Sequence, residues 1–112
     1  MVTRTDSTYL IHTRAGVATV STLIPYEDRV TSNVTRWECQ LALTRGDFTL
    51  FEDFRMTPDG PFKPLAQYTK LDLQKVLETL ARSPQTEQFL TRFETVYAQV
   101  PNDSFLVSQL SD

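Results

Sequence analysis

Apolar and polar side chains alternate along much of the first half of the chain, with the period of two that is typical of strands burying one face. The runs at residues 8–12 and 17–24 flank the turn-prone sequence Thr13-Arg14-Ala15-Gly16 and predict an antiparallel hairpin. Pro25 is expected to end the second run, and residues 26–33 are expected to form a polar connection.

A second hairpin is predicted from residues 34–44 and 47–56, with Arg45-Gly46 as its two-residue loop. This loop places Cys39 opposite Glu52 on a face that is otherwise apolar. The apolar members of that face are Trp37, Leu41, Leu43, Phe48, Leu50 and Phe54, together with Cys39. The same loop gives the other face the opposed pairs Gln40 with Phe51, Glu38 with Asp53, and Arg36 with Arg55.

The second half of the chain changes to a helical period. Residues 57–68 hold three prolines and a Pro-Asp-Gly turn, so we expect an irregular crossover there. Thr69 is a suitable N-cap, with Asp72 three residues later as a capping-box variant. Apolar side chains then recur at helical spacing at Leu73, Val76, Leu77, Leu80 and Ala81, leaving Lys70, Gln74, Lys75 and Glu78 for solvent. Ser83-Pro84 predicts the start of a second helix, which continues to about Val100.

These elements predict a single α+β domain over residues 1–112. Its four-stranded antiparallel sheet, made of two hairpins, is followed by two C-terminal helices packed on one face, because each layer then buries the apolar side of the other. Residues 1–6 and 102–112 are expected to be loosely ordered tails.

Composition narrows the chemistry that this domain can perform. The chain has one cysteine, one histidine and three glycines, which argues against zinc clusters, His-based triads and glycine-rich phosphate loops, so we expect no metal and no cofactor. A net charge of -3 argues against nucleic acid and anionic membranes as partners. The lone cysteine and the lack of an apolar run of roughly 18 residues favour a cytoplasmic protein.

Cys39, Glu52 and His12 are the only catalytic set that the sequence suggests. The predicted register places a carboxylate directly across from a thiol, and His12 lies in the first hairpin. A carboxylate raises the pKa of a neighbouring thiol, however, and free cysteine is commonly a small buried residue. A bulge near Leu50-Phe51 would also turn Glu52 outward. We therefore expect no enzyme activity.

The polar sheet face is the better candidate site, because arginine and exposed aromatic side chains favour protein binding. The candidate partner-binding residues are Arg36, Glu38, Phe51, Asp53 and Arg55 on this face, and Phe62 and Tyr68 on the 57–68 loop. The favoured hypothesis is a non-catalytic protein–protein interaction module: a small acidic regulator, assembly factor or inhibitor. The alternatives are a small-ligand pocket between sheet and helices near Trp37, Phe54 and Tyr97, and a homodimer formed through a sheet edge.

Overall fold

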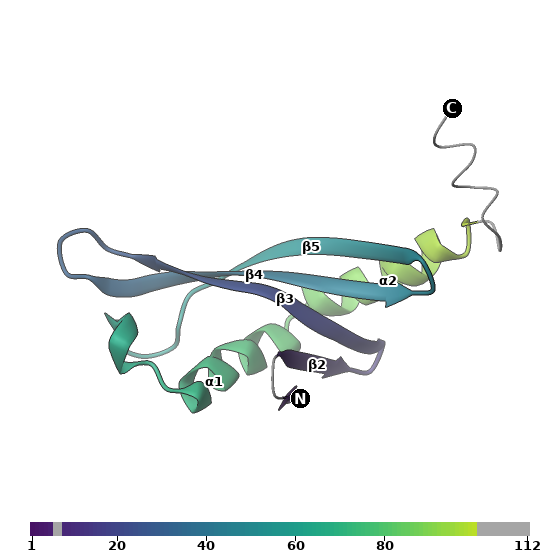
Figure 1. The fold of residues 1–112 in the computed structure, drawn as a ribbon. Coiled ribbons are helices and arrows are strands. Elements are labelled where there is room, and N and C mark those ends of the chain that lie inside the picture. Colours follow the sequence, from purple (N-terminus) through teal and green to yellow (C-terminus); the bar gives the residue numbers. More distant parts are fainter. Residues whose placement is uncertain (6–7, 101–112) are drawn as a thin grey trace.

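The chain forms an antiparallel sheet followed by two helices, and both helices contact the same face of the sheet (Figure 1). The computed structural model describes residues 1–5 and 8–100. The strands are β1 (Val2–Arg4), β2 (Tyr9–Thr13), β3 (Gly16–Glu27), β4 (Asn33–Arg45), β5 (Phe48–Met56) and β6 (Lys63–Pro64). The helices are the 3-10 helix η1 (Leu65–Gln67), α1 (Lys70–Ala81) and α2 (Pro84–Tyr97). The sheet order is β1-β2-β3-β4-β5, and β6 pairs with the start of β4.

The predicted α+β class is confirmed, but the sheet formed by the described residues has six strands rather than four. Residues 1–6 were expected to form a loose arm, yet Val2–Arg4 make up β1, because Val2 pairs with Ile11 and its side chain is buried in the core. The second added strand, β6, lies in the crossover predicted to be irregular. The prediction for residues 102–112 lies outside the described residues.

Strand β3 does not end where the sequence suggested. It continues through Pro25 to Glu27, and β4 begins at Asn33, so the connection expected over residues 26–33 is confined to residues 28–32. Proline is tolerated in a strand where its missing N–H faces a free edge. Among the described residues, β2 pairs with β3 only as far as Thr19, which leaves that side of Pro25 without a neighbouring strand.

The loop of the β4–β5 hairpin is Gly46-Asp47 rather than Arg45-Gly46. Arg45 pairs with Phe48, so the true register is shifted by two residues from the predicted one. Because strand faces alternate with a period of two, this shift leaves each side chain on its predicted face but changes its partner. Cys39 therefore lies opposite Phe54 rather than Glu52.

Both predicted helix starts are confirmed. The Thr69 side chain accepts a hydrogen bond from the Asp72 N–H, and the Asp72 carboxylate accepts one from the Thr69 N–H. The hydrogen bonds that this carboxylate accepts from the Thr69 N–H, the Lys63 ammonium and the Thr69 hydroxyl lower the pKa of Asp72 to about 2. Ser83 caps α2, which ends at Tyr97 rather than at Val100.

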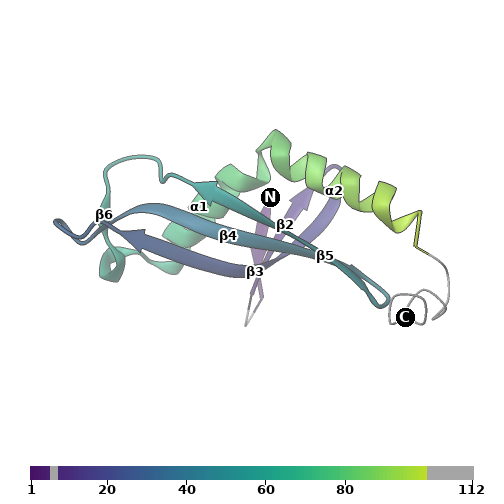
Figure 2. The same ribbon diagram turned by 90° about the horizontal axis from the view of Figure 1, so that it is seen from above.

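The core lies between the helices and one face of the sheet. From α1 and α2 it receives Val76, Leu77, Leu80, Ala81, Phe89, Leu90 and Phe93. From the sheet it receives Val2, Ile11, Ala18, Val20, Val34, Trp37, Cys39, Leu41, Phe54 and Met56. Seen from above, the long strands β3, β4 and β5 present their opposite face with no helix across it (Figure 2). Within residues 1–5 and 8–100, no helix therefore covers this sheet surface.

Candidate functional site

The uncovered surface, called the open face below, consists of side chains from β3, β4 and β5 that point away from the helices. Its members are Val17, Thr19, Thr22, Ile24 and Tyr26 of β3, Arg36, Glu38, Gln40, Ala42 and Thr44 of β4, and Thr49, Phe51, Asp53 and Arg55 of β5. The five candidate residues predicted on the sheet lie here together. The face divides into a charged zone and an apolar zone.

Glu38 is the centre of the charged zone. Its Oε1 lies 3.6 Å from Arg36 Nη2 and 3.5 Å from Arg55 Nε, and its Oε2 accepts a hydrogen bond of 3.2 Å from the Tyr26 hydroxyl. The Arg36 guanidinium also lies 4.2 Å above the Tyr26 ring. Exposed ion pairs of this kind contribute little to stability, about 0–1 kcal/mol each. Their main effect is to hold the two arginines in one arrangement.

The sequence-derived pairing of like charges on this face is wrong. Arg55 lies directly opposite Glu38, and Asp53 lies opposite Gln40, because of the two-residue shift in register. Gln40 accepts a hydrogen bond from the Ser21 hydroxyl at 3.1 Å and donates one to Asp53 at 3.3 Å. This chain of hydrogen bonds crosses three strands and separates the charged zone from the apolar zone.

Phe51 and Val17 dominate the apolar zone. Phe51 is 52% exposed and lies opposite Ala42, whose methyl group is too small to cover the ring. Val17 is 45% exposed, and both side chains line a shallow depression together with Thr19, Thr44 and other residues of this zone. Phe51 is four residues from Arg55 along β5, or about 13 Å. The aromatic and cationic groups therefore form neighbouring zones and not one cluster.

The two loop candidates lie elsewhere. Tyr68 packs edge-on against the buried Trp37, with 5.3 Å between ring centroids, and is partly buried. Phe62 remains exposed on the segment that leads into β6. Tyr68 thus stabilises the core at the end of the crossover, and Phe62 is not part of the open face.

The proposed catalytic residues do not converge. Cys39 is 1% exposed on the core face, and burial, assisted by the negative charge of Asp53, raises the pKa of its thiol to about 12. Glu52 lies opposite Leu41 and pairs with Arg92 at 2.5 Å. His12 is on the other side of the sheet, where its Nε2 and Thr3 Oγ1 share a hydrogen bond of 2.9 Å. This arrangement keeps Cys39 as a neutral thiol.

The residues suggested for a small-ligand pocket are packed against other aromatic rings. Trp37 contacts Tyr68, and Phe54 lies edge-on to Phe89 with a centroid distance of 6.2 Å. Tyr97 stacks on Phe93 beside Phe48, at the opposite end of the β4–β5 hairpin from Trp37. The three predicted residues therefore do not line one site.

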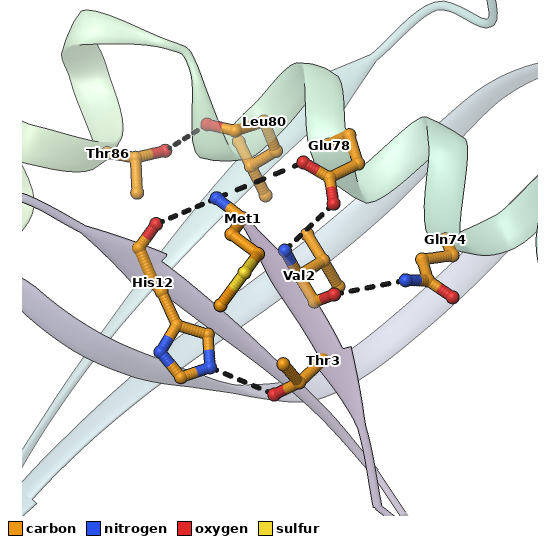
Figure 3. Close-up of polar contacts among 8 residues, drawn as sticks. All are labelled: Met1, Val2, Thr3, His12, Gln74, Glu78, Leu80 and Thr86. Atoms are coloured by element: carbon orange, nitrogen blue, oxygen red, sulfur yellow. Dashed lines mark hydrogen bonds and ion pairs between the residues drawn. The ribbon is translucent and has the colours of Figure 1, made fainter.

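The outer edge of β1 is closed by side chains of α1 (Figure 3). The Val2 N–H donates to Glu78 Oε1 at 2.8 Å, and Gln74 Nε2 donates to the Val2 carbonyl at 3.0 Å. The sequence pattern assigned Gln74 and Glu78 to solvent, and this was wrong, because the pattern gave no sign of the strand that they contact. In the same view, Thr86 of α2 donates to the Leu80 carbonyl of α1 and fixes the junction of the helices.

The other edges of the sheet are also obstructed. Beyond Thr19, the exposed side of β3 carries a register irregularity between Val20 and Thr22, and Pro25 lacks an N–H. The Thr8 hydroxyl donates to the Val20 carbonyl at this point. At the opposite edge, α2 runs beside β5 (Figure 2), and Arg92 of α2 pairs with Glu52. Bulges, proline and covering helices all discourage strand addition.

Within residues 1–5 and 8–100, no helix is long and apolar enough to cross a membrane, and no group of three or more His, Cys, Asp and Glu side chains has the geometry to hold a metal ion. In comparisons with known proteins, no family model matched the sequence, and neither a curated protein nor a solved structure was significantly similar to it.

Sequence reasoning missed the contribution of β3 to the open face. Tyr26 was assigned to a loop, although it orders both Glu38 and Arg36. The alternation of side chains along the strand indicates this contribution. Thr22, Ile24 and Tyr26 are exposed at every second position, and Thr19 lies on the same face before the register irregularity between Val20 and Thr22. Pro25 concealed it, because proline was taken as the end of the strand.

Proposed function

We propose that this chain is a non-catalytic protein–protein interaction module that binds its partner through the open face. The single observation that supports this most strongly is the presence of ordered arginines and exposed Phe51 on one sheet surface that neither helix of the described residues covers. Aromatic and arginine side chains supply most of the affinity at protein interfaces. A small regulator, assembly factor or inhibitor is the class of protein that this arrangement fits best.

The partner should match the two zones. The Arg55 side chain is 74% exposed whereas that of Glu38 is 28% exposed, so a carboxylate on the partner could pair with Arg55 as well. The apolar zone around Phe51 and Val17 requires an apolar contact surface beside that carboxylate. Because the hydrogen bonds and ion pairs of Glu38 already order the arginines, less side-chain entropy is lost on binding.

A reducing compartment such as the cytoplasm suits this role. Because the chain has one cysteine, it forms no disulfide within the chain and needs no oxidising environment to fold. We therefore expect the partner in the same compartment.

Affinity capture with matched variants tests the proposal. Wild type, an Arg36→Glu/Phe51→Ala/Arg55→Glu variant and a Lys75→Glu/Arg82→Glu control are immobilised and incubated with native host extract. The two variants change the net charge equally, but Lys75 and Arg82 are exposed on and just after α1. Circular dichroism first confirms that all three proteins are folded.

We expect a stoichiometric partner that wild type and the control retain and that the open-face variant loses. If all three proteins retain the same partners, the open face is not the binding surface. If only the control loses them, the partner binds on the helical side.

A further inference from the structure

The apolar zone of the open face continues beyond β3 onto β2, because the strands pair without a break across this end of the sheet. Leu10 lies directly opposite Thr19, which lies opposite Ala42. Ala42 in turn lies opposite Phe51. Directly opposed residues share a face of the sheet, and so do residues two apart along a strand. Leu10 and His12 of β2 therefore belong to the same surface as Phe51.

His12 lies between two exposed apolar side chains on this surface. On one side it pairs with Val17, which is 45% exposed and lines the same shallow depression as Phe51. On the other side it exchanges both backbone hydrogen bonds with Met1, whose side chain is also exposed. Residues that exchange both bonds are directly opposed and share a face. An apolar partner surface that covers Val17 therefore also meets the His12 ring.

A hydrogen bond holds the His12 ring in place. Its Nε2 and Thr3 Oγ1 share a bond of 2.9 Å, and Figure 3 shows the ring beside Thr3, away from the Gln74 and Glu78 side chains of α1. A hydroxyl both donates and accepts, so this bond is compatible with a neutral and with a protonated ring. The bond therefore positions the partly buried His12 side chain without selecting its charge.

The charged groups closest to His12 along the chain are cations. The Met1 ammonium donates to the His12 carbonyl and pairs with Glu78 at 3.9 Å, and Arg14 of the β2–β3 turn pairs with Glu87 at 3.6 Å. Both carboxylates belong to the helices, on the other side of the sheet. Within residues 1–5 and 8–100, His12 itself forms no ion pair.

The carboxylates of the open face lie in the charged zone. Glu38 is occupied by two arginines, and Asp53 accepts a hydrogen bond from Gln40. Three strand spacings separate β2 from β5, which is about 14 Å. The neighbours of His12 on β1 and β3 that share its face are Met1, Thr3 and Val17. Among the described residues, a protonated His12 therefore has no counter-charge beside it.

We propose that His12 is a further contact residue of the open face and that the partner binds its neutral form, so that binding weakens as the pH falls. This inference rests on the proposed function. Histidine is the side chain that ordinarily changes charge between pH 5 and 8. The partner surface that covers Val17 and Phe51 is apolar, and desolvating an imidazolium against it without a counter-charge is costly. Partner and proton therefore each weaken the binding of the other.

The test uses the partner that wild type retains, and the Arg36→Glu/Phe51→Ala/Arg55→Glu variant loses, in affinity capture. Its dissociation constant is measured by isothermal titration at about pH 7.5 and about pH 5.5, one unit on either side of the ordinary histidine pKa of about 6.5. Three proteins are compared: wild type, His12→Gln and His12→Lys. Circular dichroism confirms that each is folded at both pH values.

The two variants separate charge from structure. The chain has one histidine, so His12→Gln removes its only imidazole while keeping a group that hydrogen-bonds to Thr3. His12→Lys places a permanent positive charge at the same position. Titrating groups of the partner affect all three proteins alike, so the difference between wild type and His12→Gln isolates the contribution of His12.

For wild type, we expect the dissociation constant to rise between the higher and the lower pH by about tenfold more than it does for His12→Gln. At the higher pH, His12→Gln should bind within about twofold of wild type, and His12→Lys should bind about tenfold or more weakly. A histidine that only supports the fold would make both variants equally weak.

The same change with pH in wild type and His12→Gln would overturn the inference, and so would equal binding by wild type and His12→Lys, or equal weakening by both variants. Tighter binding by wild type at the lower pH would overturn the preference for the neutral ring. In each of these cases the proposed function stands, because the partner still requires the open face. If no captured protein depends on Arg36, Phe51 and Arg55, the proposed function fails and this inference fails with it.

Discussion

Cys39 shows, at the scale of a single residue, how position in the sheet decides the chemistry of a side chain. The sequence identified this thiol as the best nucleophile available, yet the fold buries it opposite Phe54. Burial disfavours the thiolate, and the pKa of about 12 keeps the group protonated in the folded chain. A thiol in this state is a poor nucleophile.

The raised pKa of Cys39 predicts a specific loss of stability in alkali. In the unfolded chain the thiol ionises near its ordinary pKa of about 8.5. Above that pH the unfolded chain releases a proton that the folded chain keeps, so the free energy of unfolding falls as pH rises toward the folded pKa. About one pH unit above the ordinary value, the loss is about 1 kcal/mol.

Urea unfolding of wild type and Cys39→Ala at neutral and alkaline pH measures this effect. Between neutral and alkaline pH, the free energy of unfolding should fall more for wild type than for Cys39→Ala. A folded wild-type protein whose thiol reacts with a disulfide reagent as fast as free cysteine would contradict the assignment.

Phe51 illustrates what could be predicted for a site residue. Alternation along residues 47–56 correctly placed it on the polar face, since a strand face depends only on the period. Its neighbours could not be predicted, because they depend on the offset between β4 and β5, and a change of two residues in the loop position alters every pair. The members of the face from β4 and β5 were therefore predictable, and the division of the face into two zones was not.

At the scale of the element, the β4–β5 loop selects the register. Gly46 has a φ of 61°, a left-handed conformation that other residues adopt at a cost. No side chain or backbone atom lies within 4 Å of the position where a Cβ would be added, so only backbone strain opposes substitution. We expect Gly46→Ala to lower the free energy of unfolding by about 1 kcal/mol and Gly46→Asn to lower it less.

Urea unfolding of the three proteins measures the difference. Because asparagine tolerates the left-handed region better than alanine, the free energy of unfolding should decrease in the order wild type, Gly46→Asn, Gly46→Ala. Equal stability of Gly46→Ala and wild type would contradict the loop assignment.

The contact between α1 and β1 gives a second prediction at this scale. Removing the carboxylate in Glu78→Ala leaves the Val2 N–H without its acceptor, which we expect to cost about 1–3 kcal/mol. Glu78→Gln keeps an acceptor oxygen and should recover most of this stability. The measurements are urea unfolding and hydrogen exchange at the Val2 amide.

Lys75→Ala is the control for this prediction, because Lys75 is exposed on the same helix. It should leave both the free energy of unfolding and the exchange of Val2 unchanged. Fast exchange of the Val2 amide in wild type would show that the contact does not form.

At the scale of the whole molecule, long periodic segments were predictable and short strands were not. Both helix starts and the two-layer arrangement followed from Thr69, Ser83 and two apolar stripes. Strands β1 and β6 have three and two residues, which is too short to show a period, and they form only because β2 and β4 are beside them. The outer part of the β3–β4 hairpin was not predicted, because Pro25 is typical of a strand end.

The completed fold brings side chains of three strands together on the open face. The open face combines ordered arginines with Phe51 and is proposed to bind a partner protein.

The most direct test of the open face as the binding surface is photo-crosslinking in the native host. A benzophenone amino acid replaces Phe51 in one protein and the exposed Thr79 of α1 in another. We predict a single crosslinked partner at position 51, which an excess of wild-type chain displaces and an excess of the Arg36→Glu/Phe51→Ala/Arg55→Glu variant does not. No crosslinked partner at position 51, or the same partner from both positions, would contradict it.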